Sequence, residues 1–147
     1  MKRANVSFQI DKEVDFKTKA LNWAAQPSAD QKTSQPLCYF DSNHHKDEYT
    51  QFDALIGVGK LAEINMNSPS GFDELRKFYK RCNDWLLGYL SYDLKNEVED
   101  LQSDNQDFQQ TPDLYFFQPE KLIIIKGNSC EFHYPDHLKA QAQQDFE

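Results

Sequence analysis

WLLGYLSYDLKNEVE, residues 85–99, decides the fold of this chain, because an apolar stretch runs directly into a polar one. Both alternating faces of its first six residues are apolar, which is typical of a strand buried on both sides. Gly88 interrupts that strand and indicates a bulge or the close approach of another backbone. Asp93 predicts the cap of a helix, and the apolar positions of this helix would be Leu94, Val98 and Leu101. We therefore expect a buried strand that includes Trp85, Leu87 and Leu90, followed by an amphipathic helix.

The sequence before this segment predicts further strands and two helices. Apolar residues alternate with polar ones over residues 5–10, the pattern of a half-buried strand. A helix should follow from about Asp11, since apolar residues recur there at helical spacing; they are Phe16, Ala20, Trp23 and Ala24. Residues 37–40 and 52–66 are typical of strands, and the second should bend at its glycines. The next helix is expected to bury Phe72, Leu75, Tyr79 and Cys82.

The C-terminal part predicts a β-hairpin. Residues 121–126 and 129–134 are strand-like and flank Gly127-Asn128, a two-residue spacing that favours a tight turn. Residues 102–111 are predicted to form a polar loop, and a helix should begin at Asp136. Strands joined by hairpins and mixed with helices at irregular intervals predict an α+β fold, with a largely antiparallel sheet and flanking helices.

Composition narrows the class of protein. The 147 residues are 39% hydrophobic, enough for one core. A net charge of -8 argues against binding to nucleic acid or to anionic membranes, which requires an excess of Lys and Arg. Three widely spaced cysteines predict neither a disulfide framework nor a zinc site. Because no apolar run follows the basic start of the chain, there is no signal-peptide pattern, and we expect a cytoplasmic protein.

Three segments resemble one enzyme family. They are GYLSYDL at residues 88–94 with the acidic residues after it, PLCYFDS at residues 36–42 with YTQFD at residues 49–53, and PDLYFF at residues 112–117. In this order they resemble the N-terminal region of the anthranilate synthase component I family of chorismate-using enzymes. The resemblance favours the aminodeoxychorismate synthase branch over the anthranilate synthase branch. Phe40-Asp41-Ser42 departs from the Leu-Glu-Ser motif that anthranilate synthases require.

The resemblance implies both a fold and a function. The fold would be the N-terminal portion of the layered β-sandwich of this family. The whole enzyme would aminate chorismate to 4-amino-4-deoxychorismate in para-aminobenzoate and folate biosynthesis, using Mg²⁺ and ammonia from a glutamine amidotransferase subunit. Its catalytic centre belongs to a C-terminal domain whose motifs are not found here. We therefore expect residues 1–147 to be a single N-terminal domain that is inactive alone, or alternatively a stand-alone ligand-binding or interaction module.

A vestigial tryptophan pocket is the only local site that the resemblance implies. Asp41 and Ser42 match its Glu-Ser motif, Tyr49 matches its tyrosine, and Gln51 stands where an arginine can occur. A neutral amide replaces a charge-assisted donor at that last position. The expected affinity for L-tryptophan is therefore low, and no catalytic, cofactor-binding or metal-binding residue is assigned.

Two other patterns carry little weight. Imidazoles and carboxylates gather at residues 41–48 (Asp41, His44, His45, Asp47 and Glu48), but adjacent histidines seldom converge on one ion, and a solvated loop is the simpler interpretation. Gly57-Val58-Gly59-Lys60 resembles a phosphate-binding loop only in part, because it lacks the full spacing and the hydroxyl residue after the lysine. Nucleotide binding is not expected.

Overall fold

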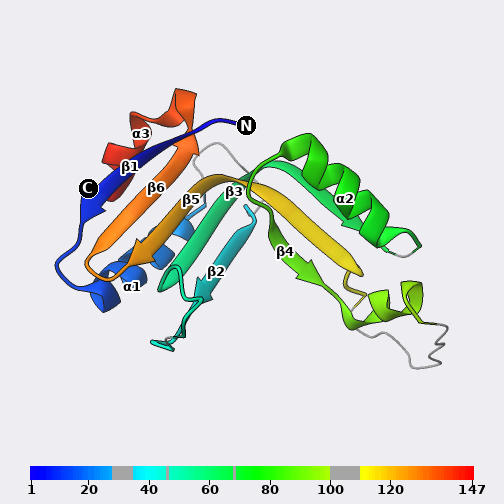
Figure 1. Ribbon diagram of the computed structural model, residues 1–147. Coiled ribbons are helices and arrows are strands. Elements are labelled where there is room, and N and C mark those ends of the chain that lie inside the picture. The colour runs from blue at the N-terminus through cyan, green and yellow to red at the C-terminus, as the bar shows by residue number, and fades with distance from the viewer. Residues whose placement is uncertain (28–34, 46, 68, 100–109) are drawn as a thin grey trace. The chain divides into compact units, whose positions relative to one another are not determined.

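The computed structural model describes residues 1–27, 35–45, 47–67, 69–99 and 110–147, which form an α+β structure around a six-stranded sheet (Figure 1). Its strands are β1 (Arg3–Gln9), β2 (Leu37–Asp41), β3 (Ala54–Met66), β4 (Leu87–Leu90), β5 (Leu114–Lys126) and β6 (Ser129–Pro135). Its helices are α1 (Glu13–Ala24), α2 (Gly71–Cys82) and α3 (Gln141–Phe146), with short 3₁₀ helices η1 (Tyr92–Glu97) and η2 (Asp136–Leu138).

The sheet has the strand order β1-β6-β5-β3-β2, and β4 also pairs with β5. The pairs β1–β6, β2–β3, β4–β5 and β5–β6 are antiparallel, so the predicted class of a largely antiparallel α+β fold is confirmed. The predicted hairpin is also confirmed, because β5 and β6 meet at Gly127, whose φ of 54° is favourable for glycine. Gly59, one of the glycines at which β3 was predicted to bend, has a φ of 67°.

The chain divides into two compact units, and β3 and β5 contribute residues to both. The first unit comprises Met1–Lys60 and Pro119–Glu147, and the second comprises Leu61–Gln118. The single N-terminal domain predicted for residues 1–147 stays a prediction. Among the residues that the structure describes, no helix combines the length and the apolar character needed to cross a membrane.

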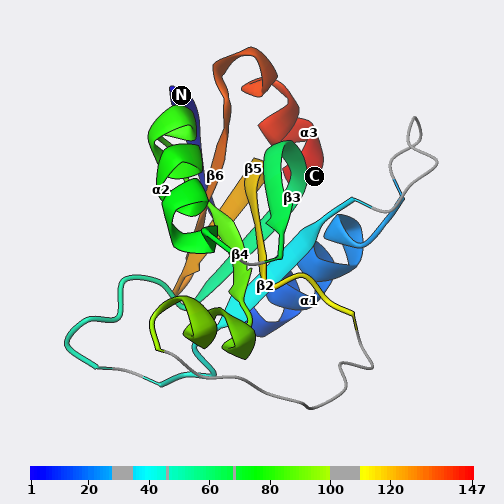
Figure 2. The same ribbon diagram turned by 90° about the vertical axis from the view of Figure 1, so that its right-hand side faces the viewer.

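The core of the first unit lies between the sheet and the helices α1 and α3, which cover the same face of the strands (Figure 2). The predicted stripe on α1 is confirmed, since Ala20 and Ala24 are buried and Phe16 and Trp23 pack against them. Ile10, which follows β1, is also buried, and the sheet and α3 contribute the remaining buried residues Ala54, Ile56, Val58, Ile123, Ile125, Cys130, Phe132, Tyr134 and Ala142. Removing apolar side chains from water is the main driving force for this packing.

In the second unit, α2 buries Cys82 as predicted, leaves Phe72 and Leu75 half-buried, and exposes Tyr79. Phe78 and Cys82 are buried, whereas Tyr79 is exposed, so the prediction for Tyr79 is wrong. The helix begins at Gly71, and its buried positions Gly71, Phe78 and Cys82 follow spacings of seven and four residues. When these three positions face the core, position 79 lies toward the solvent side of the helix.

The helix predicted after Asp93 is instead the short 3₁₀ helix η1, which follows Ser91. Leu94 is buried as predicted, Val98 is exposed, and Leu101 lies outside the described residues. The Glu97 carboxylate at the end of η1 accepts hydrogen bonds from the N–H groups of Gly71 at 2.6 Å and Phe72 at 3.3 Å. The first N–H groups of a helix have no partner within it, so Glu97 supplies the acceptor at the start of α2.

The pairing of β4 with β5 explains the glycine at position 88. Gly88 pairs with Phe116, and a Cβ atom at Gly88 would lie 2.0 Å from the Tyr115 carbonyl oxygen, so the predicted close approach of a second backbone is confirmed. Leu87 is buried as predicted, but Trp85 is 37% exposed and Leu90 is 47% exposed. Those two predictions are wrong because the paired strand is short: Trp85 precedes it and Leu90 is its last residue.

Candidate functional site

The predicted site residue Asp41 lies at the end of β2, where it meets a lysine of α1. Lys17 is 7% exposed, and its Nζ lies 3.1 Å from Asp41 Oδ1 and 2.6 Å from Glu13 Oε1. The Tyr39 hydroxyl donates a hydrogen bond to Asp41 Oδ2, and the Asn43 N–H donates one to Asp41 Oδ1 at 2.8 Å. We call Glu13, Lys17, Tyr39 and Asp41 the lysine cluster. A buried ammonium needs such partners to remain charged.

The pKa values of the lysine cluster favour its charged pairs. Burial lowers the pKa of Lys17, but hydrogen bonds to Glu13 and Asp41 outweigh it and raise the pKa above 10.5. Burial raises the pKa of Asp41, but bonds from Tyr39, Asn43 and Lys17 bring it below 3.8. Burial and the hydrogen bond to Asp41 raise the pKa of Tyr39 to about 12.

These shifts fix the sign of the pH dependence of stability. A lowered carboxyl pKa stabilises the fold above the unfolded value of 3.8, and this contribution is lost as the pH falls through the lowered pKa of Asp41. A raised ammonium pKa stabilises the fold below 10.5, and this contribution is lost as the pH rises through the raised pKa of Lys17. The lysine cluster therefore stabilises the fold most at pH values between 3.8 and 10.5.

The other predicted pocket residues differ widely in exposure. The Ser42 N–H donates to the Asp53 carbonyl at 2.9 Å, and its buried Oγ has no hydrogen-bond partner among the described residues. Tyr49 lies in the loop after Ser42 and is 78% exposed, and Gln51 is exposed as well. Asp41 and Ser42 are thus adjacent at the strand end, while Tyr49 and Gln51 extend into solvent. The predicted tryptophan pocket stays a prediction.

The loop that resembled a metal cluster is held by polar contacts of its own. Asp47 accepts hydrogen bonds from the Tyr49 N–H at 2.9 Å and the Thr50 hydroxyl at 3.0 Å, and His45 Nε2 lies 3.9 Å from Asp47 Oδ2. Within the described part of the chain, no three His, Cys, Asp or Glu side chains form a group suited to a metal ion. The segment that resembled a phosphate loop lies inside β3, where a strand backbone replaces the required loop.

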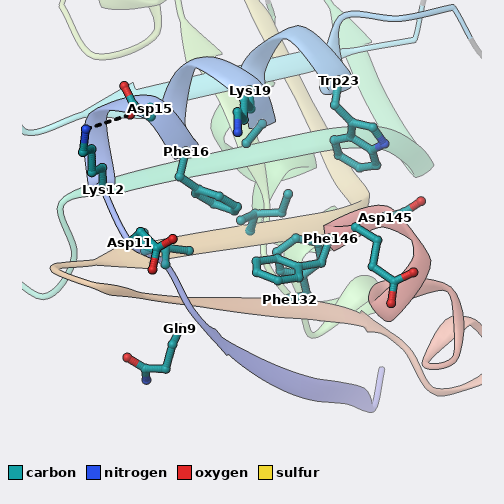
Figure 3. A pocket seen from close by; sticks show the side chains of 14 residues that line it. Gln9, Asp11, Lys12, Asp15, Phe16, Lys19, Trp23, Phe132, Asp145 and Phe146 are labelled. Carbon is teal, nitrogen blue, oxygen red and sulfur yellow. Dashed lines mark ion pairs between the residues drawn. The ribbon is translucent and has the colours of Figure 1, made fainter.

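A pocket between α1 and α3 was not predicted. It has a volume of about 550 Å³, within the range of small-ligand sites. Its floor is formed by the buried residues Ile10, Ala20, Ile123 and Phe132. Figure 3 shows Phe16 pointing from α1 into this space and Phe146 facing it from α3, and the two ring centroids lie 5.9 Å apart. We call this space the aromatic pocket.

Charged side chains surround the mouth of the aromatic pocket, and most have partners. Lys12 lies 3.9 Å from Asp15, and Asp145 lies 2.7 Å from Lys121. Asp145 also accepts a hydrogen bond from the Tyr134 hydroxyl at 2.9 Å. The exposed Lys19 makes no hydrogen bond or ion pair with any described residue. It is therefore available to a negatively charged group that enters the pocket.

The sequence contains only weak indications of the lysine cluster and of the aromatic pocket. Glu13 and Lys17 are spaced four residues apart, as ion pairs on a helix are, but this spacing is common on solvated helices. The stripe that contains Phe16 and Trp23 was predicted to be core, and it is also one wall of the aromatic pocket. The opposite wall comes from α3, more than a hundred residues away in the sequence, so no local pattern reveals it.

Comparison with models of known protein families finds no match to this chain, and comparison with curated proteins finds none either. The family resemblance therefore rests on the three sequence segments at residues 36–53, 88–94 and 112–117 alone. Two of these segments lie side by side, because β4 carries Gly88 and pairs with β5 at residues 114–117.

Proposed function

We propose that this chain is the N-terminal, non-catalytic part of an aminodeoxychorismate synthase component I. The whole enzyme would aminate chorismate to 4-amino-4-deoxychorismate on the route to para-aminobenzoate and folate. The chain would supply part of the layered β-sandwich of the anthranilate synthase component I family. Chorismate and Mg²⁺ would bind to a C-terminal catalytic domain, and a glutamine amidotransferase subunit would deliver ammonia.

The pairing of β4 with β5 carries the proposal. Leu87–Leu90 pairs with Leu114–Phe117, so two segments that resemble the family in sequence form one antiparallel ladder. The glycine of the first segment is required by this pairing, since the Tyr115 carbonyl and the Phe116 Cα lie 2.0 and 2.6 Å from a Cβ added to Gly88. The glycine and its partner strand form one structural feature, which supports reading the two segments as a single signature.

The remaining family-like segment, at residues 36–42, contains β2 and supports the same proposal. Leu37–Asp41 pairs with Ala54–Val58 of β3, and Asp41 and Ser42 lie where the strand ends. The Asp41 carboxylate is already bound to the Lys17 ammonium at 3.1 Å. A ligand ammonium would have to replace Lys17 there, and the exposed Gln51 has no formal charge to pair with a ligand carboxylate. We propose that L-tryptophan binds this chain weakly or not at all.

Complementation tests the proposal and separates it from its alternatives. The uninterrupted reading frame that contains this chain would be expressed in one bacterial strain that requires para-aminobenzoate and in another that requires anthranilate. The proposal predicts growth of the first strain without its supplement and no growth of the second. Rescue of the second strain would favour an anthranilate synthase, and rescue of neither would favour a non-enzymatic module. A truncated frame that encodes residues 1–147 alone is the matched control and should rescue neither strain.

A further inference from the structure

We propose that the aromatic pocket binds a small aromatic carboxylate. The ring of this ligand would enter the space between α1 and α3, and its carboxylate would pair with Lys19. The proposal concerns a part of the first unit that the proposed function does not use, and it stands whether or not the chain belongs to an aminodeoxychorismate synthase.

The shape of the aromatic pocket favours a ring over a chain of polar groups. Its floor is buried and apolar, and the partly exposed rings of Phe16, Trp23 and Phe146 stand around it. Phe146 is held in place by Phe8, whose ring it stacks on at 4.1 Å between centroids with an interplanar angle of 6°. Phe16 and Phe146 already contact each other, with ring centroids 5.9 Å apart, so a ligand ring would pack beside this pair and not between the two rings.

Lys19 is the side chain at the mouth that would attract an anion. Lys19 follows Phe16 by three residues and precedes Trp23 by four, so all three side chains lie on one face of α1. Figure 3 shows Lys19 extending from α1 on the same side of the pocket as these rings. The carboxylates of Asp15 and Asp145 are already paired with Lys12 and Lys121. A ligand carboxylate at Lys19 would gain an ion pair without displacing any existing one among the described residues.

Two carboxylates at the mouth, those of Glu147 and Asp11, compete with Lys19 for the charge of a ligand. Glu147 accepts a hydrogen bond from the Gln143 amide at 3.0 Å. Asp11 makes no ion pair with a described residue, and it would attract a cationic ligand. It lies just before the first turn of α1, where the unpaired N–H groups of the helix partly compensate a negative charge. Lys19 lies in the second half of the helix, next to the rings that would hold the ligand.

Matched probes of opposite charge test the proposal. The chain has two tryptophans, so Trp85→Phe leaves Trp23, in the wall of the aromatic pocket, as the fluorescent reporter. This protein would be titrated with 4-phenylbutyrate, 4-phenylbutanol and 4-phenylbutylamine, which share a ring and differ in charge. The carboxylate should give a saturable change with a Kd on the order of 1 mM, as expected for a ligand of this size. The alcohol should bind more weakly, and the amine should bind most weakly.

Substitution of Lys19 tests whether this side chain pairs with the ligand carboxylate. Lys19→Gln should weaken binding of the carboxylate about two- to fivefold, the range for an exposed ion pair, and should leave binding of the alcohol unchanged. Lys126→Gln is the matched control, because Lys126 is also exposed in the first unit and does not line the pocket. Equal or tighter binding of the amine, an equal effect of the two substitutions, or no saturable response to the carboxylate would each overturn the proposal.

Discussion

Among glycine-to-alanine substitutions, we expect Gly88→Ala to destabilise the second unit the most. The new Cβ would lie 2.0 Å from the Tyr115 carbonyl oxygen and 2.6 Å from the Phe116 Cα, and both are backbone atoms that no rotamer change can move. Overpacking of this kind costs about 1–3 kcal/mol. Separation of β4 from β5 would also expose Leu87, whose burial contributes about 1.5–3 kcal/mol. We expect Gly88→Ala to lower the free energy of unfolding by about 3 kcal/mol or more.

Urea unfolding measured by fluorescence is the assay. A Trp23→Phe background leaves Trp85, which belongs to the same compact unit as Gly88, as the reporter. Gly127→Asn is the control, because no atom lies within 4 Å of an added Cβ there and asparagine tolerates the φ of 54°. The control should change the stability by less than about 1 kcal/mol. An unfolding midpoint for Gly88→Ala that equals that of the parent protein would refute the close-approach argument.

Four further substitutions test individual side chains. Leu87→Ala should cost about 2–5 kcal/mol because the side chain is buried, whereas Leu90→Ala should cost clearly less; equal midpoints in urea would contradict the assigned exposures. Glu97→Gln should lower stability by about 1 kcal/mol, because a weaker acceptor replaces the carboxylate at the start of α2, and an unchanged thermal midpoint would argue against this capping role. Lys17→Met should cost about 3 kcal/mol at pH 7 because it leaves the Asp41 carboxylate without its cation, and the difference from the parent should shrink as the pH falls below 3.8. A difference that stays constant from pH 7 to pH 3 would show that the pair contributes nothing.

The sequence predicted those features that depend on local pattern. The stripe on α1 follows from helical spacing, and the hairpin at Gly127 follows from a two-residue turn between two strand-like runs. Gly88 was also interpreted correctly, because a glycine within an apolar strand indicates close backbone contact. In each case the residues within a few positions of one another contain the necessary information.

Features that depend on distant partners were missed or misjudged. The sequence could not show which of the neighbouring aromatic residues of α2 is buried: Phe78 is 3% exposed, whereas Tyr79 is 56% exposed. The capping role of Glu97 was not predicted, since its partners lie 25 and 26 residues earlier in the sequence. Lys17 was not considered at all, because a lysine on a helix is usually exposed and its burial depends on Asp41.

The most direct test of the proposed function is to identify the product formed from chorismate. The protein encoded by the uninterrupted reading frame would be incubated with chorismate, Mg²⁺ and ammonia, and the products would be separated and identified by mass. The account predicts 4-amino-4-deoxychorismate from that protein and no turnover by residues 1–147 alone. Formation of anthranilate, failure to consume chorismate, or turnover by the 147-residue chain would contradict it.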